Sequence, residues 1–174
     1  MKTRADLIEL VPAGGVVVEL GVAAGAFSEA MLQRRPNITV VSVDRWSDHH
    51  GEAEYKLACG RLATYGHRSI IVRATFKEAL KLFRAETFDL VYVDGYAHTG
   101  QEGGQTLRDW WSKVRPGGVM AGHDYHPKWQ PTIDAVDAFV AEGGLGVRLI
   151  QGDTYPSWWV RKPDAPQPSA TQRA

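Results

Sequence analysis

Three side chains that could hold a metal ion follow two apolar runs of this 174-residue chain. The run Phe88–Asp94 ends in a carboxylate, and the run Val119–His123 ends in an imidazole that is followed directly by Asp124. If the two runs are neighbouring strands, Asp94, His123 and Asp124 converge at one edge of the sheet. Two carboxylates and an imidazole suit a divalent metal that keeps open positions for a substrate, such as Mg²⁺ or Mn²⁺. Such a metal could lower the pKa of a bound hydroxyl and orient it.

A general base is the second requirement of this chemistry. His98 lies four residues after Asp94, close enough to take a proton in a site that uses Asp94. His123 is the alternative base if no metal is bound. A structural reading also stays open for His123 and Asp124, in which they only form hydrogen bonds with loop backbone.

The elements that must position these residues alternate along the chain. The expected strands are residues 16–20, 39–44, 69–73, 88–94, 118–123, 147–150 and 157–161. The expected helices are residues 3–10, 27–34, 52–65, 76–83, 104–114 and 131–142. Alternation of strand and helix predicts parallel strands with crossover helices. The link between the last two strands is too short for a crossover, so these strands should form an antiparallel hairpin. The sequence therefore predicts an α/β fold with a Rossmann-like, mostly parallel seven-stranded sheet, helices on both faces and a C-terminal antiparallel hairpin.

A glycine-containing turn follows the first expected strand. The segment Val16–Gly25 begins with a β-branched run, which is followed by Glu19. Two glycines, Gly21 and Gly25, come after it. Phosphate sites use bare backbone N–H groups, so a carboxylate at this point favours a ligand with an amine or another cation. The spacing also differs from G-x-G-x-x-G, which disfavours a dinucleotide oxidoreductase.

Other strand ends carry residues suited to a nucleoside. Asp44 could accept both hydroxyls of a ribose, Trp46 offers an aromatic face that could cover an adenine, and Thr75 could meet an adenine amine. Each has a structural alternative: Asp44 as a helix N-cap, Trp46 as a core residue, and Thr75 as the N-cap of a capping box with Glu78.

The order of these motifs resembles class I S-adenosylmethionine-dependent methyltransferases. Asp94-Gly95, the nearby His98, the segments Asp109–Trp111 and Arg115–Gly118, and the His-Asp pair after the fifth strand resemble the family that includes cephalosporin-hydroxylase-like and macrolide sugar O-methyltransferases. The arrangement is also similar to catechol O-methyltransferases, which bind magnesium at the ends of the same two strands. The resemblance covers about residues 14–143.

The resemblance implies S-adenosylmethionine as cofactor, and it implies roles for individual residues. The implied cofactor-binding residues are Glu19, Gly21, Gly25, Asp44, Trp46, Thr75 and Asp94. The implied metal ligands are Asp94, His123 and Asp124, with His98 and Asp94 as catalytic residues. Two departures are present: residues 99–104 lengthen the link to the Trp-containing helix, and His123 replaces a carboxylate of the catechol-type site. The second departure could shift the metal preference toward manganese, iron or zinc, or abolish metal binding.

Composition limits the function classes. The chain has 20 basic and 20 acidic residues, which predicts no nucleic-acid or membrane partner, and it has a single cysteine, Cys59. We expect one domain over residues 1–163, a disordered tail over residues 164–174, and a cytoplasmic location, because no signal or membrane-spanning run is visible. An exposed tryptophan from the pair Trp158 and Trp159 would offer a contact for a homodimer.

The sequence thus favours an enzyme that methylates a hydroxyl of a small-molecule substrate with help from a metal. Two alternatives remain at this stage. One is a metal-independent O- or N-methyltransferase, and the other is a catalytically inactive module that holds the cofactor or serves a partner.

Overall fold

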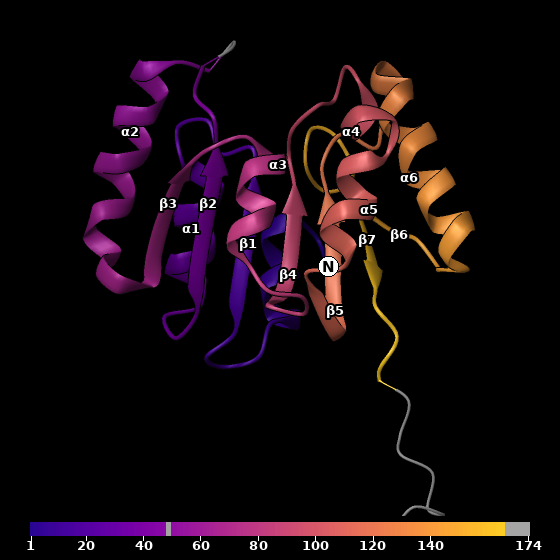
Figure 1. Cartoon of the computed structure of the whole chain (residues 1–174), viewed down its shortest axis with the longest axis horizontal. Helices are drawn as coiled ribbons and strands as arrows, with labels where there is room; N and C mark the ends of the chain where they lie inside the picture. Colours follow the sequence, from indigo (N-terminus) through magenta and orange to yellow (C-terminus); the bar gives the residue numbers. More distant parts are fainter. Residues whose placement is uncertain (48–49, 166–174) are drawn as a thin grey trace, which may run out of the picture.

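The chain folds around one seven-stranded sheet in the computed structural model, which describes residues 1–47 and 50–165 (Figure 1). The strands are β1 (Val16–Leu20), β2 (Thr39–Asp44), β3 (Ser69–Arg73), β4 (Phe88–Val93), β5 (Val114–Gly122), β6 (Arg148–Ile150) and β7 (Ser157–Arg161). They lie in the order β3-β2-β1-β4-β5-β7-β6. Strands β1 to β5 are parallel, whereas β7 runs antiparallel to both β5 and β6. The predicted fold class and the C-terminal antiparallel hairpin are confirmed.

Helices cover both faces of the sheet. The α-helices are α1 (Ala26–Arg34), α2 (Glu52–Leu62), α3 (Phe76–Ala79), α4 (Gly100–Gly103), α5 (Gln105–Trp111) and α6 (Gln130–Gly143). Short 3₁₀ segments are η1 (Arg4–Leu10), η2 (Ala63–Arg68), η3 (Leu80–Leu82) and η4 (Pro127–Trp129). In Figure 1, α3, α5 and α6 lie in front of the sheet and α1 lies behind it. Within the described residues, every helix is too short or too polar to cross a membrane.

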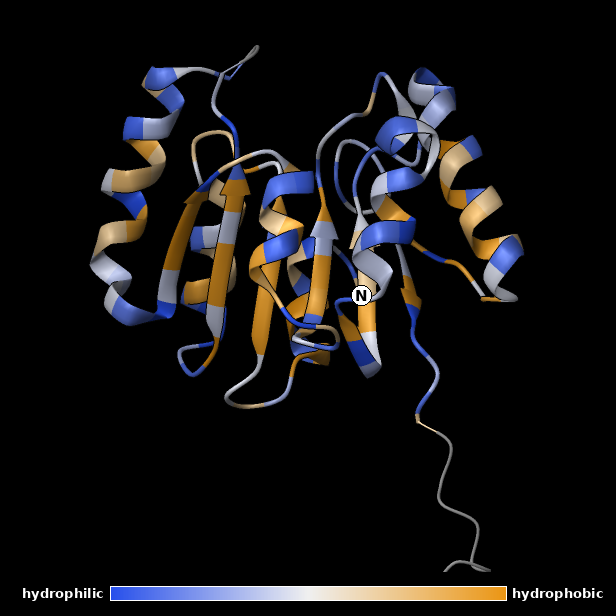
Figure 2. Ribbon diagram, viewed as in Figure 1, coloured by the Kyte–Doolittle hydropathy of each residue, from blue (hydrophilic) through white to orange (hydrophobic). Residues whose placement is uncertain are grey.

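Two apolar cores hold these layers together. The front core packs strand residues against Phe76, Leu107, Trp110, Val136 and Phe139 of the helices. The rear core packs the other strand face against Leu7, Ile8, Phe27, Met31 and Leu62. Strand β4 is buried at every position, as expected for a central strand of a parallel sheet with helices on both sides. Figure 2 shows the resulting pattern, with hydrophobic strands between helices of mixed polarity.

Several predicted boundaries were wrong. The helix predicted over 52–65 ends at Leu62, and a 3₁₀ segment with Gly66 at φ 56° carries the chain into β3. The helix predicted over 76–83 divides into α3 and the 3₁₀ turn η3. The helix predicted over 104–114 ends at Trp111, and β5 begins at Val114 rather than residue 118, because Val114 pairs with Phe88 ahead of an irregularity in the ladder.

The paired tryptophans of β7 point to opposite faces of the sheet, as the alternation of a strand requires. Trp158 lies in the front core and Trp159 in the rear core, with exposed fractions of 0% and 5%. The expectation of an exposed tryptophan on this strand was therefore wrong, because helices cover both faces of β7. Most of the tail expected from residue 164 lies outside the described residues.

Candidate active site

A cavity of about 350 Å³ opens at the carboxyl ends of the central strands. The chain order changes direction here, because β1 lies between β2 on one side and β4 on the other. Ligands of open α/β sheets bind at such a point. The cavity is lined by Arg4, by Glu19 and the turn after β1 (Gly21, Val22, Ala23, Ala24, Ala26, Phe27), by Asp44, Arg45 and His50, by Ala74, Thr75 and Phe76, and by Asp94, Gly95 and Tyr96.

Gly21 lets two strand ends approach each other closely. Its φ is 93°, and a Cβ atom built at this position would lie 2.3 Å from the carbonyl oxygen of Asp94. No other residue type fits here without moving the turn after β4. Gly25 has φ 80° and serves as the N-cap of α1, where a Cβ atom would press on Ala58 at 3.2 Å. Gly25 is not among the cavity-lining residues, so its observed role is to place α1 against α2.

Glu19 is a buried carboxylate in the cavity wall. Its side chain has an exposed fraction of 2%, and it accepts a short hydrogen bond from the Ser28 hydroxyl, which also pairs with Ser42 at 2.6 Å. Burial raises the pKa of Glu19 from its ordinary 4.5 to about 8, against the opposing effect of the Ser28 hydrogen bond. The wall therefore holds a mostly neutral carboxyl group near pH 7.

Asp44 organises the turn after β1. Its Oδ2 accepts hydrogen bonds from the backbone N–H groups of Val22 at 2.8 Å and Ala23 at 3.0 Å, and its Oδ1 accepts one from Trp46 N–H at 2.9 Å. The carboxylate also lines the cavity. Asp44 thus lies where the ribose role would place it, and its hydrogen bonds join two loops rather than cap a helix.

Trp46 does not line the cavity. Its ring is buried, with an exposed fraction of 1%, and packs against Tyr55 with ring centroids 4.9 Å apart. Its indole N–H donates to the carbonyl oxygen of Ala23 at 2.8 Å. The expectation that this ring covers an adenine is corrected: the buried ring packs on Tyr55, which favours the core alternative.

Thr75 caps α3 and also lines the cavity. Its hydroxyl accepts a hydrogen bond from Glu78 N–H at 3.2 Å, and the Glu78 carboxylate accepts one from Thr75 N–H at 2.9 Å, which is a complete capping box. Thr75 also lines the cavity. Its hydroxyl further donates to the Glu78 carboxylate at 2.7 Å, so the side chain is already engaged at the start of α3.

The three expected metal ligands do come together. One ligand atom from each of Asp94, His123 and Asp124 can be chosen so that all lie within 4.8 Å of one another. His123 Nδ1 lies 2.9 Å from Asp124 Oδ1 and 3.7 Å from Asp94 Oδ1. Burial raises the pKa of Asp94, although the charges of His123 and Arg4 oppose that rise. All three side chains are half-buried, and Asp94 links this cluster to the cavity.

Arg4 is a site residue that sequence reasoning missed. It comes from η1, and its Nη1 lies 2.7 Å from Asp94 Oδ2. Its guanidinium carbon lies 4.6 Å from the centre of the Phe27 ring. The two partners of the ion pair are 90 residues apart in the chain, and no motif around Arg4 signals this contact.

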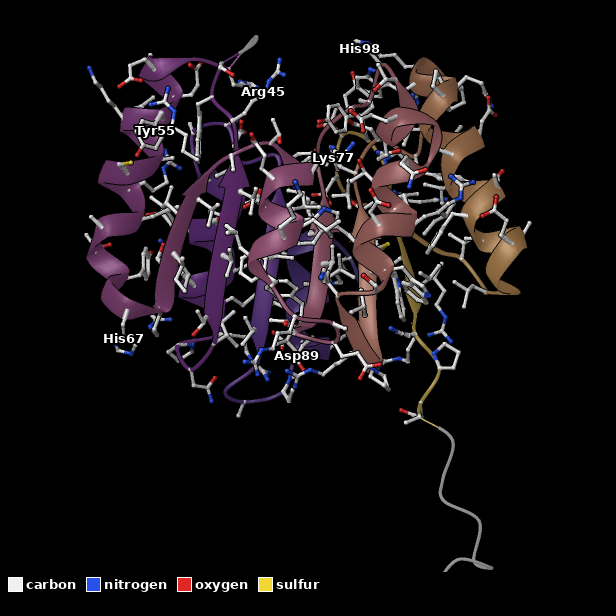
Figure 3. The ribbon with its side chains drawn as sticks, viewed as in Figure 1. Arg45, Tyr55, His67, Lys77, Asp89 and His98 are labelled. Atoms are coloured by element: carbon white, nitrogen blue, oxygen red, sulfur yellow. The ribbon has the colours of Figure 1, made fainter. Side chains whose placement is uncertain are left out.

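His98 lies away from the cavity. The side chain is exposed, and Figure 3 places it at the outer end of the loop that follows β4. Tyr96, with φ of 61°, turns inward instead and packs on Phe76 with ring centroids 5.0 Å apart. The longer link after His98 is itself tightly packed, because a Cβ atom on Gly100 would lie 1.9 Å from the carbonyl oxygen of Pro131. The expectation that His98 stands beside Asp94 was therefore wrong.

A group of aromatic rings flanks His123 on the side away from β1. The Tyr155 ring lies 6.4 Å from His123, 5.3 Å from His126 and 4.4 Å from Trp129, measured between ring centroids. Tyr155 comes from the β6–β7 loop and Trp129 from η4. Sequence reasoning gave no signal for Tyr155 or Trp129.

Strained backbone is concentrated at this edge. Ala23, Trp46, Tyr96 and Asp124 all have φ between 45° and 61°, and each follows a different strand at its carboxyl end. Residues other than glycine adopt this conformation at a cost, and such residues gather at functional sites. The strained backbone therefore also indicates that the functional site lies at this edge of the sheet.

The comparisons with known proteins agree with this geometry. A family model described as a methyltransferase domain matches residues 18–125, which is more than half of the chain. Among proteins with curated functions, none matches this sequence.

Solved structures of methyltransferases share the fold. The O-methyltransferase from Bacillus cereus in complex with SAH is 17% identical, with a TM-score of 0.69 over 90% of this chain and 77% of that chain. The precorrin-6y C5,15-methyltransferase from Geobacter metallireducens is 15% identical, with a TM-score of 0.69 over 93% and 87% of the two chains. The SAM-dependent O-methyltransferase from Thermotoga maritima is 15% identical, with a TM-score of 0.67 over 94% and 64%. The chain therefore belongs to the methyltransferase domain family and shares the fold of class I S-adenosylmethionine-dependent methyltransferases.

Proposed function

We propose that this methyltransferase acts on a hydroxyl group of a small molecule. The observation that carries the proposal is the convergence of Asp94, His123 and Asp124 beside the cavity. An alcohol or phenol is a weak nucleophile until it loses its proton, so O-methylation needs a base or a positive charge at the acceptor. This cluster offers both a base and ligands for a cation at the same strand ends.

The order of the strands suggests how the cofactor lies. Along the carboxyl edge, Thr75 follows β3, Asp44 ends β2, Glu19 lies in β1, and Asp94 follows β4. We place adenosine at the β3–β2 side, where apolar walls and the Asp44 carboxylate are available, and the methionine end at the β1–β4 side. When bound, the cofactor would supply an electrophilic methyl group, and its sulfur would keep the electron pair of the broken carbon–sulfur bond. His123, one strand further along, is then on the acceptor side.

When no metal is bound, His123 is the base in this proposal. Asp124 Oδ1 lies 2.9 Å from its Nδ1, which favours a proton on Nδ1 and leaves the lone pair on Nε2. Nε2 can then take the hydroxyl proton as the new carbon–oxygen bond forms. The Tyr155 and Trp129 rings beside it suit an acceptor that presents its hydroxyl on a ring.

The same residues fit a divalent cation. Their donor set is two carboxylates and one imidazole, and with an ion bound His123 is a ligand rather than the base. The chemistry that such a cation supplies is stabilisation of the negative charge on a hydroxyl that loses its proton. We propose Mg²⁺ or Mn²⁺ at these three residues.

A metal-independent O-methyltransferase is the second candidate, and one observation favours it. Asp94 Oδ2 already has a cationic partner in Arg4 at 2.7 Å, and His123 already has one carboxylate partner in Asp124. Asp94 therefore already has a cation from the protein, and a neutral His123 would act as the base without an ion.

Binding measurements separate these candidates before an acceptor is known. Calorimetry with S-adenosylhomocysteine should show binding to the wild-type protein both with Mg²⁺ and with a chelator. Electron paramagnetic resonance of added Mn²⁺ should show one tight site that Asp124→Asn weakens and that the exposed-site control Asp134→Asn leaves intact. Cofactor binding without a Mn²⁺ site would favour the metal-independent candidate. Absence of cofactor binding would remove the proposed activity and leave an inactive module.

A further inference from the structure

Arg4 is held in place at the cavity by contacts on three sides. Its Nη1 donates to Asp94 Oδ2 at 2.7 Å, and its guanidinium stacks over the Phe27 ring at 4.6 Å. Its backbone N–H donates to the Asp153 carboxylate at 2.7 Å, which ties η1 to the β6–β7 loop. The side chain is 28% exposed and lines the cavity. Arg4 is therefore a fixed cation that faces the ligand space, unlike an arginine on an open surface.

The charges around the cavity make Arg4 distinctive. Arg4 and Arg45 are the two arginines among the described residues that line it. Arg45 follows β2 and Asp94 follows β4, and β1 lies between these strands. At ordinary strand spacing, Arg45 and Asp94 therefore lie roughly 10 Å apart. Arg4 is thus the arginine at the Asp94 end of the cavity, where the proposed function places the methionine end of the cofactor.

The charges of the Arg4–Asp94 pair are complementary to those of an α-amino acid. A carboxylate and a guanidinium 2.7 Å apart can receive an ammonium and a carboxylate, respectively, so that one ion pair is exchanged for two. The guanidinium carries five N–H donors, which allows it to bind a carboxylate while it stays on the Phe27 ring. Glu19 does not oppose an incoming carboxylate strongly near pH 7, because burial raises its pKa to about 8.

We propose that Arg4 binds the carboxylate of the cofactor's amino-acid end and that the Arg4–Asp94 ion pair opens to receive the zwitterion. This inference rests on the proposed function, which places that end of the cofactor beside Asp94. It adds a residue from the N-terminal segment to a site otherwise built from strand ends. It also makes carboxylate recognition separable from recognition of the adenosine.

Two ligands test the inference in a thermodynamic cycle. S-adenosylhomocysteine carries the carboxylate, and its decarboxylated analogue keeps the adenosine and the amine but lacks that group. Calorimetry gives the affinity of both for the wild-type protein and for Arg4→Gln. We expect Arg4→Gln to weaken S-adenosylhomocysteine binding roughly 10- to 100-fold, the range for a hydrogen bond to a charged group, and to change binding of the analogue less than threefold.

A matched control uses the other arginine–aspartate pair on β4. Arg115 Nη1 lies 3.0 Å from Asp89 Oδ1 at the opposite end of the strand, so Arg115→Gln removes a similar ion pair away from the cavity. Arg115→Gln should leave both affinities unchanged, and circular dichroism should show both variants folded. Equal weakening of both ligands by Arg4→Gln, or no weakening of either, would overturn the assignment while the proposed function stands. A wild-type protein that binds neither ligand would instead overturn the proposed function, and this inference with it.

Discussion

Replacing Glu19 with glutamine should stabilise the protein at neutral and alkaline pH. The side chain is 2% exposed, and its pKa is raised from 4.5 to about 8, chiefly because burial disfavours the charged form. At a pH between these two pKa values, Glu19 keeps its proton in the folded protein but has lost it in the unfolded chain. The free energy of unfolding must therefore fall as pH rises through this window, by about 1.4 kcal/mol per pH unit.

The size of the effect follows from the width of that window. At pH 7 the unfavourable contribution of Glu19 is about 3 kcal/mol, and above pH 8 it approaches about 5 kcal/mol. Glutamine has nearly the same shape and cannot ionise, and its carbonyl oxygen can still accept the hydrogen bond from Ser28. The variant should thus match the wild type near pH 4.5 and exceed it increasingly as pH rises.

Urea unfolding of both proteins at pH 5, 7 and 9 measures this difference directly. Other groups, including Asp94, titrate in both proteins, so most of their contribution cancels when the wild-type value is subtracted. The exposed control Glu9→Gln measures the effect of removing a surface carboxylate that pairs with Arg34 outside the cavity. Parallel pH profiles for Glu19→Gln and the wild type would refute the reasoning, because they would mean that Glu19 ionises in the folded protein as easily as in the unfolded chain.

Three further substitutions test individual contacts. Asp44→Asn should weaken S-adenosylhomocysteine binding roughly 10-fold and lower the free energy of unfolding by about 2 kcal/mol, because an amide cannot accept all three backbone N–H bonds; calorimetry and urea unfolding measure the two effects. His123→Gln should lower kcat roughly 100- to 10 000-fold with an acceptor found by screening hydroxylated compounds, while cofactor affinity in calorimetry stays within about threefold. Asp153→Ala should weaken S-adenosylhomocysteine binding roughly threefold or more but spare the decarboxylated analogue, because its contact with the Arg4 backbone positions the guanidinium.

The parts of the site that the sequence predicts are those fixed by the parallel sheet itself. Asp94, His123 and Asp124 could be brought together because the carboxyl ends of neighbouring parallel strands share one edge. The positions of Glu19, Gly21 and Asp44 at the cavity follow from the same rule. In these cases an apolar run that ends in a polar residue was enough to predict where the polar side chain lies on the sheet.

The residues that were misplaced depend on contacts between distant segments. His98 was expected inside, but the packing of Gly100 against α6 and the inward turn of Tyr96 carry it outward. Trp46 could equally have been a cavity wall or a core residue, and only its contact with Tyr55 on α2 decides this. Arg4 lies on a 3₁₀ segment whose place against β4 is set by tertiary packing alone. Sequence periodicity carries no information of this kind.

The contacts of Asp44 also explain why this cavity suits a nucleoside with an amino-acid end better than a dinucleotide. In a phosphate-binding turn, the backbone N–H groups after the first strand point at the anion. Here the N–H groups of Val22 and Ala23 already donate to the Asp44 carboxylate, at 2.8 and 3.0 Å. A pyrophosphate would meet a carboxylate in place of free donors, and the Asp94 carboxylate would add to the repulsion. Discrimination against anionic cofactors therefore comes from how Asp44 is hydrogen-bonded as well as from the glycine spacing that the sequence displays.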